Sequence, residues 1–306
     1  MPLFADGEEL KEVPCGFKTI DDKLPTKAKE LCCKECVSVG PKDLLYVNQR
    51  EYAVVSPDDK YIRIIGSEDS TTCHLLVVRH SGSGVTALAH MDGCDLPNGL
   101  KRMVQQVKHM SLGKPDGRLN VYIAGGFLDD RENSIELSCS IMQELINSEE
   151  DLHLCLAAIT DLNDTVKNDI HFPIVYGLAV NVQTGEVYPA KFPNKGPDMN
   201  LRGACHFAGY DTLVNIYDNK NGLLRIGPYQ WSIDSDIARW AHAPNHFIRR
   251  YLSTSPEQEP EYFEDNVRQS LLVLANHPNA VSVFTEGYPR LYQKEPDGSW
   301  KRLSNC

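Results

Sequence analysis

The segment from Gly66 to Gly93, GSEDSTTCHLLVVRHSGSGVTALAHMDG, combines one cysteine with three histidines. A thiol attacks a carbonyl or carboxamide carbon as its thiolate, so Cys73 needs a base or a lowered pKa in order to react. Histidine is the usual base, because its side chain titrates near neutral pH. The segment therefore contains the residue types of a thiol-dependent hydrolase.

The three histidines differ in whether they can meet the thiol. Side chains alternate between the two faces of a strand, so His74 and His80, at odd offsets from Cys73, are expected to point away from it. The turn SGSG then returns the chain and brings His90 back beside the start of the first strand. The spacing predicts that Cys73 and His90 form a cross-strand pair.

A third group usually orients the histidine of such a pair. Six hydroxyl or carboxylate side chains precede the thiol, and local reasoning leaves the choice open among them: Ser67, Glu68, Asp69, Ser70, Thr71 and Thr72. Backbone N–H groups around Cys73 would form an oxyanion hole if the chain turned sharply there. The alternative interpretation is that Cys73 is a core residue, the commoner role of a lone cysteine in an apolar strand.

The composition is that of an ordinary globular protein, and the charge limits the partners. Of the 306 residues, 42% are apolar and 24% are charged, which suffices for a substantial core. The net charge of -11 argues against a nucleic acid partner, because phosphate binding needs clustered Lys and Arg. The same charge is compatible with a cationic substrate such as the α-amino group of a peptide.

The cellular setting is predicted from what the sequence lacks. No apolar run approaches the roughly 20 residues that span a bilayer, so we expect no membrane association. The start, MPLFADGEEL, lacks the basic and apolar regions of a signal peptide. The 10 cysteines are too sparse for a disulfide scaffold, and we expect reduced thiols. These features predict a protein of the cytoplasm, with the nucleus as the alternative compartment.

Short β-branched or aromatic runs dominate the chain from Leu44 onward. Strands are expected over 44–47, 51–55, 61–65, 73–80, 85–92, 118–126, 152–160 and 173–182. Helical spacing appears over 132–148 and 263–274, and Asn-Gly and Asp-Gly mark hairpins over 216–226 and 290–303. The pattern predicts an α/β or α+β fold with helices on one side of layered sheets. We expect a single domain over 1–306 that begins with an irregular segment, 1–40.

Several blocks carry a specific resemblance to a known family. They are LLYVNQRE, GSEDSTTCHLLVVRHSGSG, AGGFLDDR, LRIGPYQW and LSTSP, and they extend from about Leu44 to Pro256. In these blocks the chain resembles the protein N-terminal asparagine amidohydrolases of eukaryotes. More distantly, the site resembles cysteine hydrolases typified by cytotoxic necrotizing factor and the bacterial chemoreceptor deamidase. Residues 1–40 look less like the family than the rest.

The resemblance implies a fold, a reaction and residue roles. It implies an α-β-β sandwich and hydrolysis of the side-chain amide of an N-terminal Asn to Asp, with release of ammonia and without a cofactor. Cys73 would be the nucleophile, His90 its base, and Ser67 the hydroxyl that completes a triad. The implied partners are peptides and proteins with a free N-terminal Asn. Arginylation of the new Asp would lead to ubiquitin-dependent degradation.

Specificity for an N-terminus requires a group that binds the α-ammonium, most simply a carboxylate. Glu68 and Asp69 lie near Cys73 in sequence, and Asp129 and Asp130 follow the end of an expected strand. These four carboxylates are the candidate substrate-binding residues. The alternative for the pair Asp129 and Asp130 is N-capping of the next helix.

Other interpretations of the sequence remain open. The run CCKEC holds Cys33 and Cys36 at CxxC spacing but lacks the second ligand pair of a structural zinc site, so no metal is expected. Without catalysis, the chain would be a module that binds protein N-termini and buries Cys73 in its core. Among enzymes, a thiol protease or a transglutaminase is the alternative.

Overall fold

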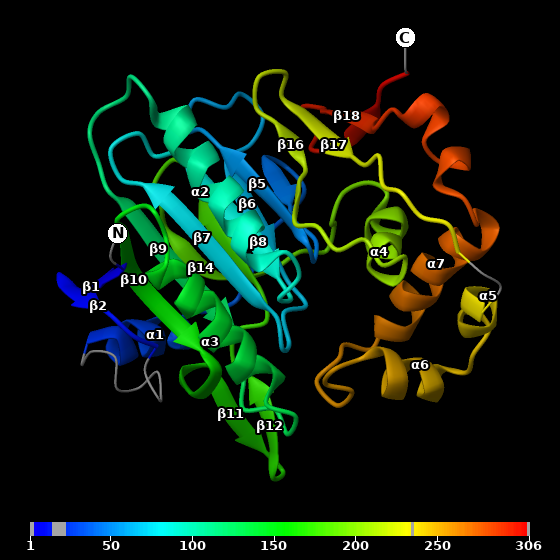
Figure 1. Ribbon diagram of the computed structural model, residues 1–306, viewed down its shortest axis with the longest axis horizontal. Coiled ribbons are helices and arrows are strands. Elements are labelled where there is room, and N and C mark those ends of the chain that lie inside the picture. Colours follow the sequence, from blue (N-terminus) through cyan, green and yellow to red (C-terminus); the bar gives the residue numbers. More distant parts are fainter. Residues whose placement is uncertain (1–2, 14–22, 234–235, 305–306) are drawn as a thin grey trace.

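Two sheets lie face to face at the centre of the fold (Figure 1). The structure is a computed structural model and describes residues 3–13, 23–233 and 236–304. In pairing order, the larger sheet contains β15 (Val214–Asn215), β5 (Glu51–Val55), β8 (Thr86–Met91), β7 (His74–His80), β9 (Leu119–Gly125), β10 (Leu152–Ile159), β1 (Leu3–Ala5) and β2 (Glu8–Leu10). The smaller contains β3 (Val37–Ser38), β14 (Val187–Lys191), β13 (Leu178–Asn181), β6 (Ile64–Ser67) and β4 (Leu44–Tyr46).

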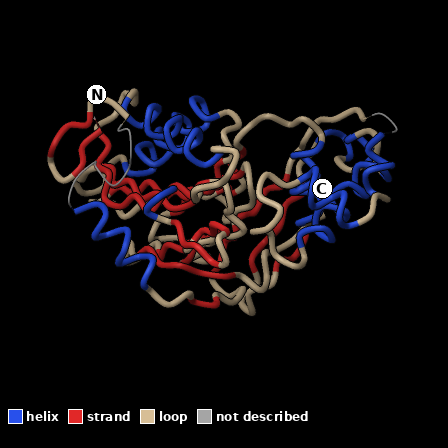
Figure 2. The backbone as a smooth tube through the Cα atoms, turned by 90° about the horizontal axis from the view of Figure 1, so that it is seen from below, coloured by secondary structure: helices blue, strands red, loops and turns tan. Residues whose placement is uncertain are grey.

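Helices α2 (Leu96–Ser111) and α3 (Asn133–Ile146) cover the outer face of the larger sheet. Strand β7 shows how the layers stack, because Leu76 and Val78 pack with these helices whereas Leu75 and Val77 face the smaller sheet. A strand buried on both faces is a nearly continuous apolar run, which explains the segment HLLVVRH. Figure 2 shows helices on one side of the strand layers. This layering of helix, sheet and sheet confirms the predicted α+β fold class.

The expectation of an irregular segment over 1–40 was wrong for much of the part that the structure describes. Strand β1 pairs in parallel with β10, with Leu3 opposite Leu152, and α1 (Lys23–Cys33) buries Leu24 and Leu31. A strand of three residues is too short to show a periodicity in sequence, and β1 exists because β10 offers it an edge to pair with. Helix α2 was also missed, although its buried Leu96, Leu100, Met103 and Val107 recur at helical spacing.

The expected strand over 173–182 was wrong in its first half. That region divides between β13 and the end of β12 (Ile170–Pro173), which forms a hairpin with β11 (Asp164–Lys167). The side chain of Asn163 explains the break, because its Oδ1 accepts a hydrogen bond from Val175 N and its Nδ2 donates to Val175 O. These bonds occupy the backbone groups that a sheet neighbour would otherwise use.

A second group of helices lies at one end of the sandwich (Figures 1 and 2). It contains α4 (Met199–Phe207), α5 (Asp236–Ala241), α6 (Asn245–Leu252) and α7 (Phe263–Asn276). A small sheet of β16 (Tyr217–Asp218), β17 (Leu223–Ile226), β18 (Arg290–Lys294) and β19 (Trp300–Arg302) completes it, with 3₁₀ turns at Ala280–Ser282 and Thr285–Gly287. None of the described helices has the length and apolar character needed to cross a membrane.

A buried ion pair joins the helical group to the sandwich. Arg202 on α4 donates through Nε to Glu51 Oε1 on β5 at 2.9 Å, and through Nη2 to the other carboxylate oxygen. Glu51 Oε2 also accepts from Asn48 N at 2.8 Å, and Arg202 Nη2 donates to Tyr46 O at 2.8 Å. Both side chains are almost fully buried, so each charge relies on the other for solvation.

We predict that Glu51→Gln lowers the free energy of unfolding by about 3–5 kcal/mol, because it leaves the Arg202 charge buried without a counter-ion. Urea denaturation followed by circular dichroism measures the loss. Lys101→Met is the matched control, because Lys101 pairs with Glu149 on the exposed surface and its loss should leave the midpoint unchanged. Equal midpoints for the two variants would contradict the prediction.

Candidate active site

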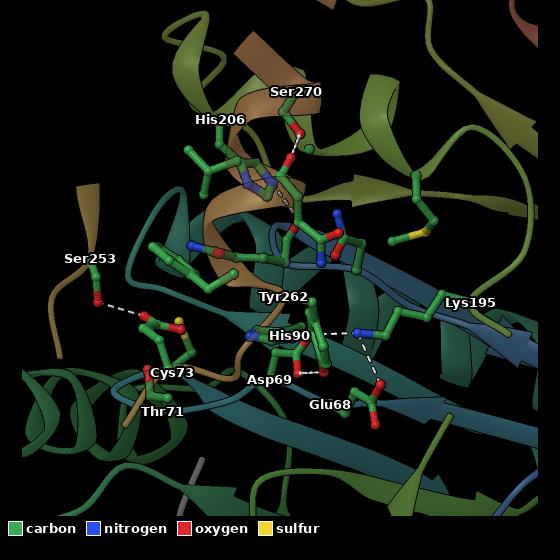
Figure 3. A pocket seen from close by; sticks show the side chains of 18 of the residues that line it. Glu68, Asp69, Thr71, Cys73, His90, Lys195, His206, Ser253, Tyr262 and Ser270 are labelled. Atoms are coloured by element: carbon green, nitrogen blue, oxygen red, sulfur yellow. Dashed lines mark hydrogen bonds and ion pairs between the residues drawn. The ribbon is translucent and has the colours of Figure 1, made fainter. Parts of the chain in front are cut away.

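A pocket of about 930 Å³ opens between the sandwich and the helical group. Cys73 and His90 line it from the larger sheet, and Phe207, Glu259 and Phe263 line it from the helical side. Figure 3 shows Cys73, His90 and Asp69 in one part of this pocket, with His206 and Ser270 in another. Cysteine, histidine and carboxylate side chains from segments far apart in the sequence therefore line one solvent-accessible pocket.

Cys73 and His90 lie on the same face of the larger sheet. In the register of β7 and β8, Leu75 is directly opposite His90, and Cys73 is two residues before Leu75. Such diagonal neighbours are about 7–8 Å apart at Cα, within reach of a histidine ring. Both residues line the pocket, and no hydrogen bond joins them among the described residues.

Ser67 is the hydroxyl that contacts His90. It ends β6 in the smaller sheet, is fully buried, and places Oγ 2.8 Å from His90 Nδ1. The hydrogen bond thus crosses the space between the two sheets. Among the other candidates for this role, the Ser70 hydroxyl donates to Cys73 O at 2.6 Å, and the Thr72 hydroxyl contacts that of Thr254 at 2.8 Å.

The thiol and the imidazole are both neutral in the resting protein. Burial lowers the pKa of His90 to about 4, although the nearby Asp92 and Asp69 charges favour its protonation. Burial also raises the pKa of the Cys73 thiol well above its usual range. When Nδ1–H donates to Ser67 Oγ, the lone pair of Nε2 is available, and this buried atom has no hydrogen-bond partner among the described residues. That tautomer is ready to accept the thiol proton.

The other two histidines face away, as strand parity predicts. His74 Nε2 lies 2.6 Å from the Ser138 hydroxyl on α3, on the opposite face of the larger sheet. His80 Nδ1 lies 3.0 Å from the Ser83 hydroxyl in the turn after β7.

The backbone at Cys73 is held by the glycine pair after β9. Gly126 N donates to Cys73 O at 3.0 Å. A Cβ on Gly125, whose φ is 134°, would come within 2.4 Å of Cys73 O, so only glycine allows this approach. The carbonyl of Cys73 is thereby fixed, while its N–H has no acceptor in the part of the chain that the structure describes. That N–H is available to bind an oxyanion.

Two of the four candidate substrate-binding carboxylates line the pocket, and both contact the same lysine. Lys195 Nζ contacts Glu68 Oε1 at 2.9 Å and also binds Asp69 Oδ2. Phe192 N donates to Glu68 Oε2 at 2.8 Å, and the Tyr262 hydroxyl donates to Asp69 Oδ1 at 2.7 Å. Each carboxylate therefore has a cation in contact, and the two carboxylates and one ammonium together carry a net charge of −1.

The assignment of Asp129 and Asp130 as substrate-binding residues was wrong, since neither lines the pocket. The Asp129 carboxylate accepts from Asn133 N at 3.0 Å and from Ser134 N at 2.8 Å, so it caps the start of α3. These N–H groups have no partner within the helix, and a carboxylate satisfies them well. Asp130 is exposed beside it.

Sequence reasoning missed Glu259, which lines the pocket from the loop between α6 and α7. The Ser253 hydroxyl donates to Glu259 Oε1 at 2.6 Å, and burial raises the pKa of this carboxyl to about 7. Its surroundings, LSTSPEQEPEYF, indicate an acidic loop, and no local signal distinguishes Glu259 from its acidic neighbours.

The cysteine-rich run lies outside this chemistry. Cys33 and Cys36 are exposed free thiols at the end of α1 and just beyond it. No group of three or more His, Cys, Asp or Glu side chains suited to a metal ion occurs within the described ranges.

We predict that His90→Gln slows alkylation of Cys73 by iodoacetamide at neutral pH by on the order of 100-fold, because the thiol loses the base that accepts its proton. Mass spectrometry of the Cys73 peptide against time and pH gives the rate. His80→Gln is the control and should leave the rate unchanged, since His80 faces away from the thiol. If His90→Gln reacted like the wild type, the pairing would be refuted.

Comparison with known proteins shows which family the chain matches. The family model described as "Protein N-terminal asparagine amidohydrolase" matches residues 34–302. The chain is 39% identical over 308 residues to the human protein of that name, covering 100% of this chain and 99% of that protein. A protein of the same name from Arabidopsis thaliana is 28% identical over 284 residues, covering 84% of this chain and 80% of that protein. The chain belongs to the protein N-terminal asparagine amidohydrolase family.

Proposed function

We propose that this protein hydrolyses the side-chain amide of an N-terminal Asn to Asp and releases ammonia. The observation that carries the proposal is the pocket lined by Cys73 and His90, whose imidazole is hydrogen-bonded to the buried Ser67. Family membership supports the choice of substrate, because the human and Arabidopsis relatives are named for the reaction on N-terminal asparagine. The substrates are therefore peptides and proteins that begin with Asn.

In the first half of the reaction, the thiol adds to the side-chain amide. His90 Nε2 accepts the proton as Cys73 Sγ forms a bond to Cγ of the substrate Asn. The carbonyl oxygen becomes an oxyanion, which the N–H of Cys73 stabilises. The charge that develops on the imidazole is stabilised by the Nδ1–H bond to Ser67 Oγ, so Ser67 acts by positioning and supporting His90.

In the second half, the amide nitrogen leaves and water completes the hydrolysis. His90 returns its proton to the amide nitrogen, the C–N bond breaks, and ammonia departs from a thioester at Cys73. A water molecule then gives a proton to His90 and adds to the thioester carbon. Collapse of that intermediate breaks the C–S bond, returns the proton to the thiol and leaves Asp. Because the resting pair is neutral, proton transfer accompanies each attack.

We predict ammonia release from peptides that begin with Asn, and none from the same peptides with N-terminal Gln or N-acetyl-Asn. Cys73→Ala should abolish it, whereas Cys33→Ala, a change to an exposed cysteine outside the pocket, should leave it unchanged. A coupled ammonia assay gives the rate, and mass spectrometry shows the gain of about 1 Da expected for conversion of an amide to an acid. Retained activity in Cys73→Ala would refute the mechanism.

The same assay separates the other interpretations. A non-catalytic module that binds N-termini would release no ammonia, and a thiol protease would shorten the peptide. A transglutaminase would release ammonia from Gln and join two chains. Equal turnover of the acetylated peptide would refute specificity for a free N-terminus.

We also infer that the product enters a degradation route in the cytoplasm, as the resemblance implies. The new N-terminal Asp is a substrate for arginylation, and ubiquitin ligation of the arginylated protein follows. A reporter protein that begins with Asn should therefore persist longer in cells whose only copy of this enzyme carries Cys73→Ala. A reporter that begins with Asp is the control and should decay equally fast in both cell lines.

A further inference from the structure

The carboxylates around the pocket differ in whether a cation compensates them. One cation, Lys195, contacts both Glu68 and Asp69. Arg50 Nε donates to Asp92 Oδ2 at 2.6 Å, and Gln49 Nε2 donates to the same oxygen at 2.8 Å. Glu259 lines the same pocket and has no ion pair with any residue that the structure describes.

Arg249 holds the backbone of the loop that carries Glu259. The Glu259 carboxylate itself has no ion pair among the described residues. Arg249 donates to the carbonyl oxygens of Pro256, Glu259 and Pro260 at 2.8, 3.2 and 3.0 Å. The charge of Arg249 is matched by Glu264, whose Oε2 accepts from Nη2 at 2.9 Å. The guanidinium therefore fixes the backbone of the loop, and Ser253 alone hydrogen-bonds the Glu259 side chain among the described groups.

Glu259 also acts electrostatically on the nucleophile. Its charge is among those that raise the pKa of the Cys73 thiol, after burial and Asp92. Figure 3 shows Ser253 and Cys73 on the same side of the pocket, and Glu259 accepts the hydrogen bond that Ser253 donates. A negative charge this close to the sulfur opposes formation of the thiolate.

We propose that Glu259 binds the α-ammonium group of the substrate, and that this binding neutralises its charge and so helps Cys73 to ionise. The proposal rests on the proposed function, because it assigns the group that recognises the free N-terminus. The substrate supplies the cation that Glu259 lacks, and its arrival removes the charge that opposes the thiolate. A substrate with a blocked amine would bind weakly and would also leave the nucleophile unassisted.

The ionisation of Glu259 gives substrate binding a pH dependence. The groups that act on it are Ser253, Asp69, Arg249 and Glu264, with Cys73 and Tyr176 also responding to its charge. Burial raises its pKa to about 7, so protonation below that pH removes the charge that an ammonium group needs. The KM for an Asn peptide should therefore rise as the pH falls through about 7, by up to tenfold per pH unit.

The decisive experiment is the pH profile of Cys73 alkylation by iodoacetamide in the full chain. Glu259→Gln should move the midpoint of the profile to lower pH by on the order of one unit. Glu257→Gln, an exposed neighbour outside the pocket, is the matched control and should leave the midpoint in place. An unchanged midpoint in Glu259→Gln would overturn the electrostatic half of the proposal.

A ligand experiment on the wild type does not depend on how the variant folds. At pH 7, where most of its α-amine is protonated, saturating glycinamide should raise the rate of Cys73 alkylation as Glu259→Gln does, at ionic strength matched with KCl. N-acetylglycinamide should leave the rate unchanged, and glycinamide should produce no further increase in Glu259→Gln. Equal effects of the two amides, or a full glycinamide effect in Glu259→Gln, would overturn the binding half.

The kinetic consequence separates this proposal from the proposed function. Glu259→Gln should lower kcat/KM for an Asn peptide by about 100-fold, the cost of losing one partner of a desolvated charge pair. It should also flatten the pH dependence of KM near neutrality. If the wild type releases ammonia and Glu259→Gln has the same kcat/KM, the role of Glu259 is refuted and the proposed function stands. If the wild type releases no ammonia from any Asn peptide, the proposed function fails, and the proposal with it.

Discussion

The register between β7 and β8 is the constraint on which the site depends. Because side chains alternate along a strand, a slip of one residue would turn His90 toward the helices and away from both Cys73 and Ser67. Two separate hydrophobic cores hold the register, since alternate residues of β7 pack against the helices and against the smaller sheet. Apolar packing thus sets the position of the proposed catalytic base. The Ser67–His90 hydrogen bond then fixes the ring across the two sheets.

Charge in and beneath the pocket follows a second constraint, which is that buried ions need partners. Arg202 has Glu51, Arg50 has Asp92, and Lys195 bridges two acidic side chains. The Arg202–Glu51 pair and the Lys195 bridge tie the helical group and its preceding loop to the sandwich, and each of these acidic side chains has a cation in contact. The exception, Glu259, is therefore the position at which an incoming cation gains most.

The sequence predicts interactions between residues that are close together in the chain better than interactions between distant residues. Strand alternation alone separates His90 from His74 and His80, because parity along a hairpin is a local property. Ser67 belongs to another sheet, so local pattern left six candidates open, and only the family resemblance favoured it.

The electrostatic partners are less predictable. Lys195 lies 126 residues from Asp69, and no spacing rule indicates that the two side chains meet. Glu259 is still more remote from Cys73 in the sequence, and nothing in its acidic loop distinguishes it from its neighbours. The same limit applies to the fold: long apolar strands were predicted well, whereas β1 exists only through its pairing with β10.

The pocket lies between the sandwich and the helical group, so its two sides can change separately in evolution or by design. The sandwich carries the thiol, the base and the hydroxyl, whereas the loop that Arg249 organises presents its carboxylate from the helical side. That loop is braced by its own contacts with Arg249 and Ser253, independently of the register that positions His90. An exchange at Glu259 therefore alters the charge that acts on Cys73 but not the strand register that positions His90. A protein built this way can acquire a preference for different chain ends while conserving one chemistry, and its loop is the natural place to graft a new specificity.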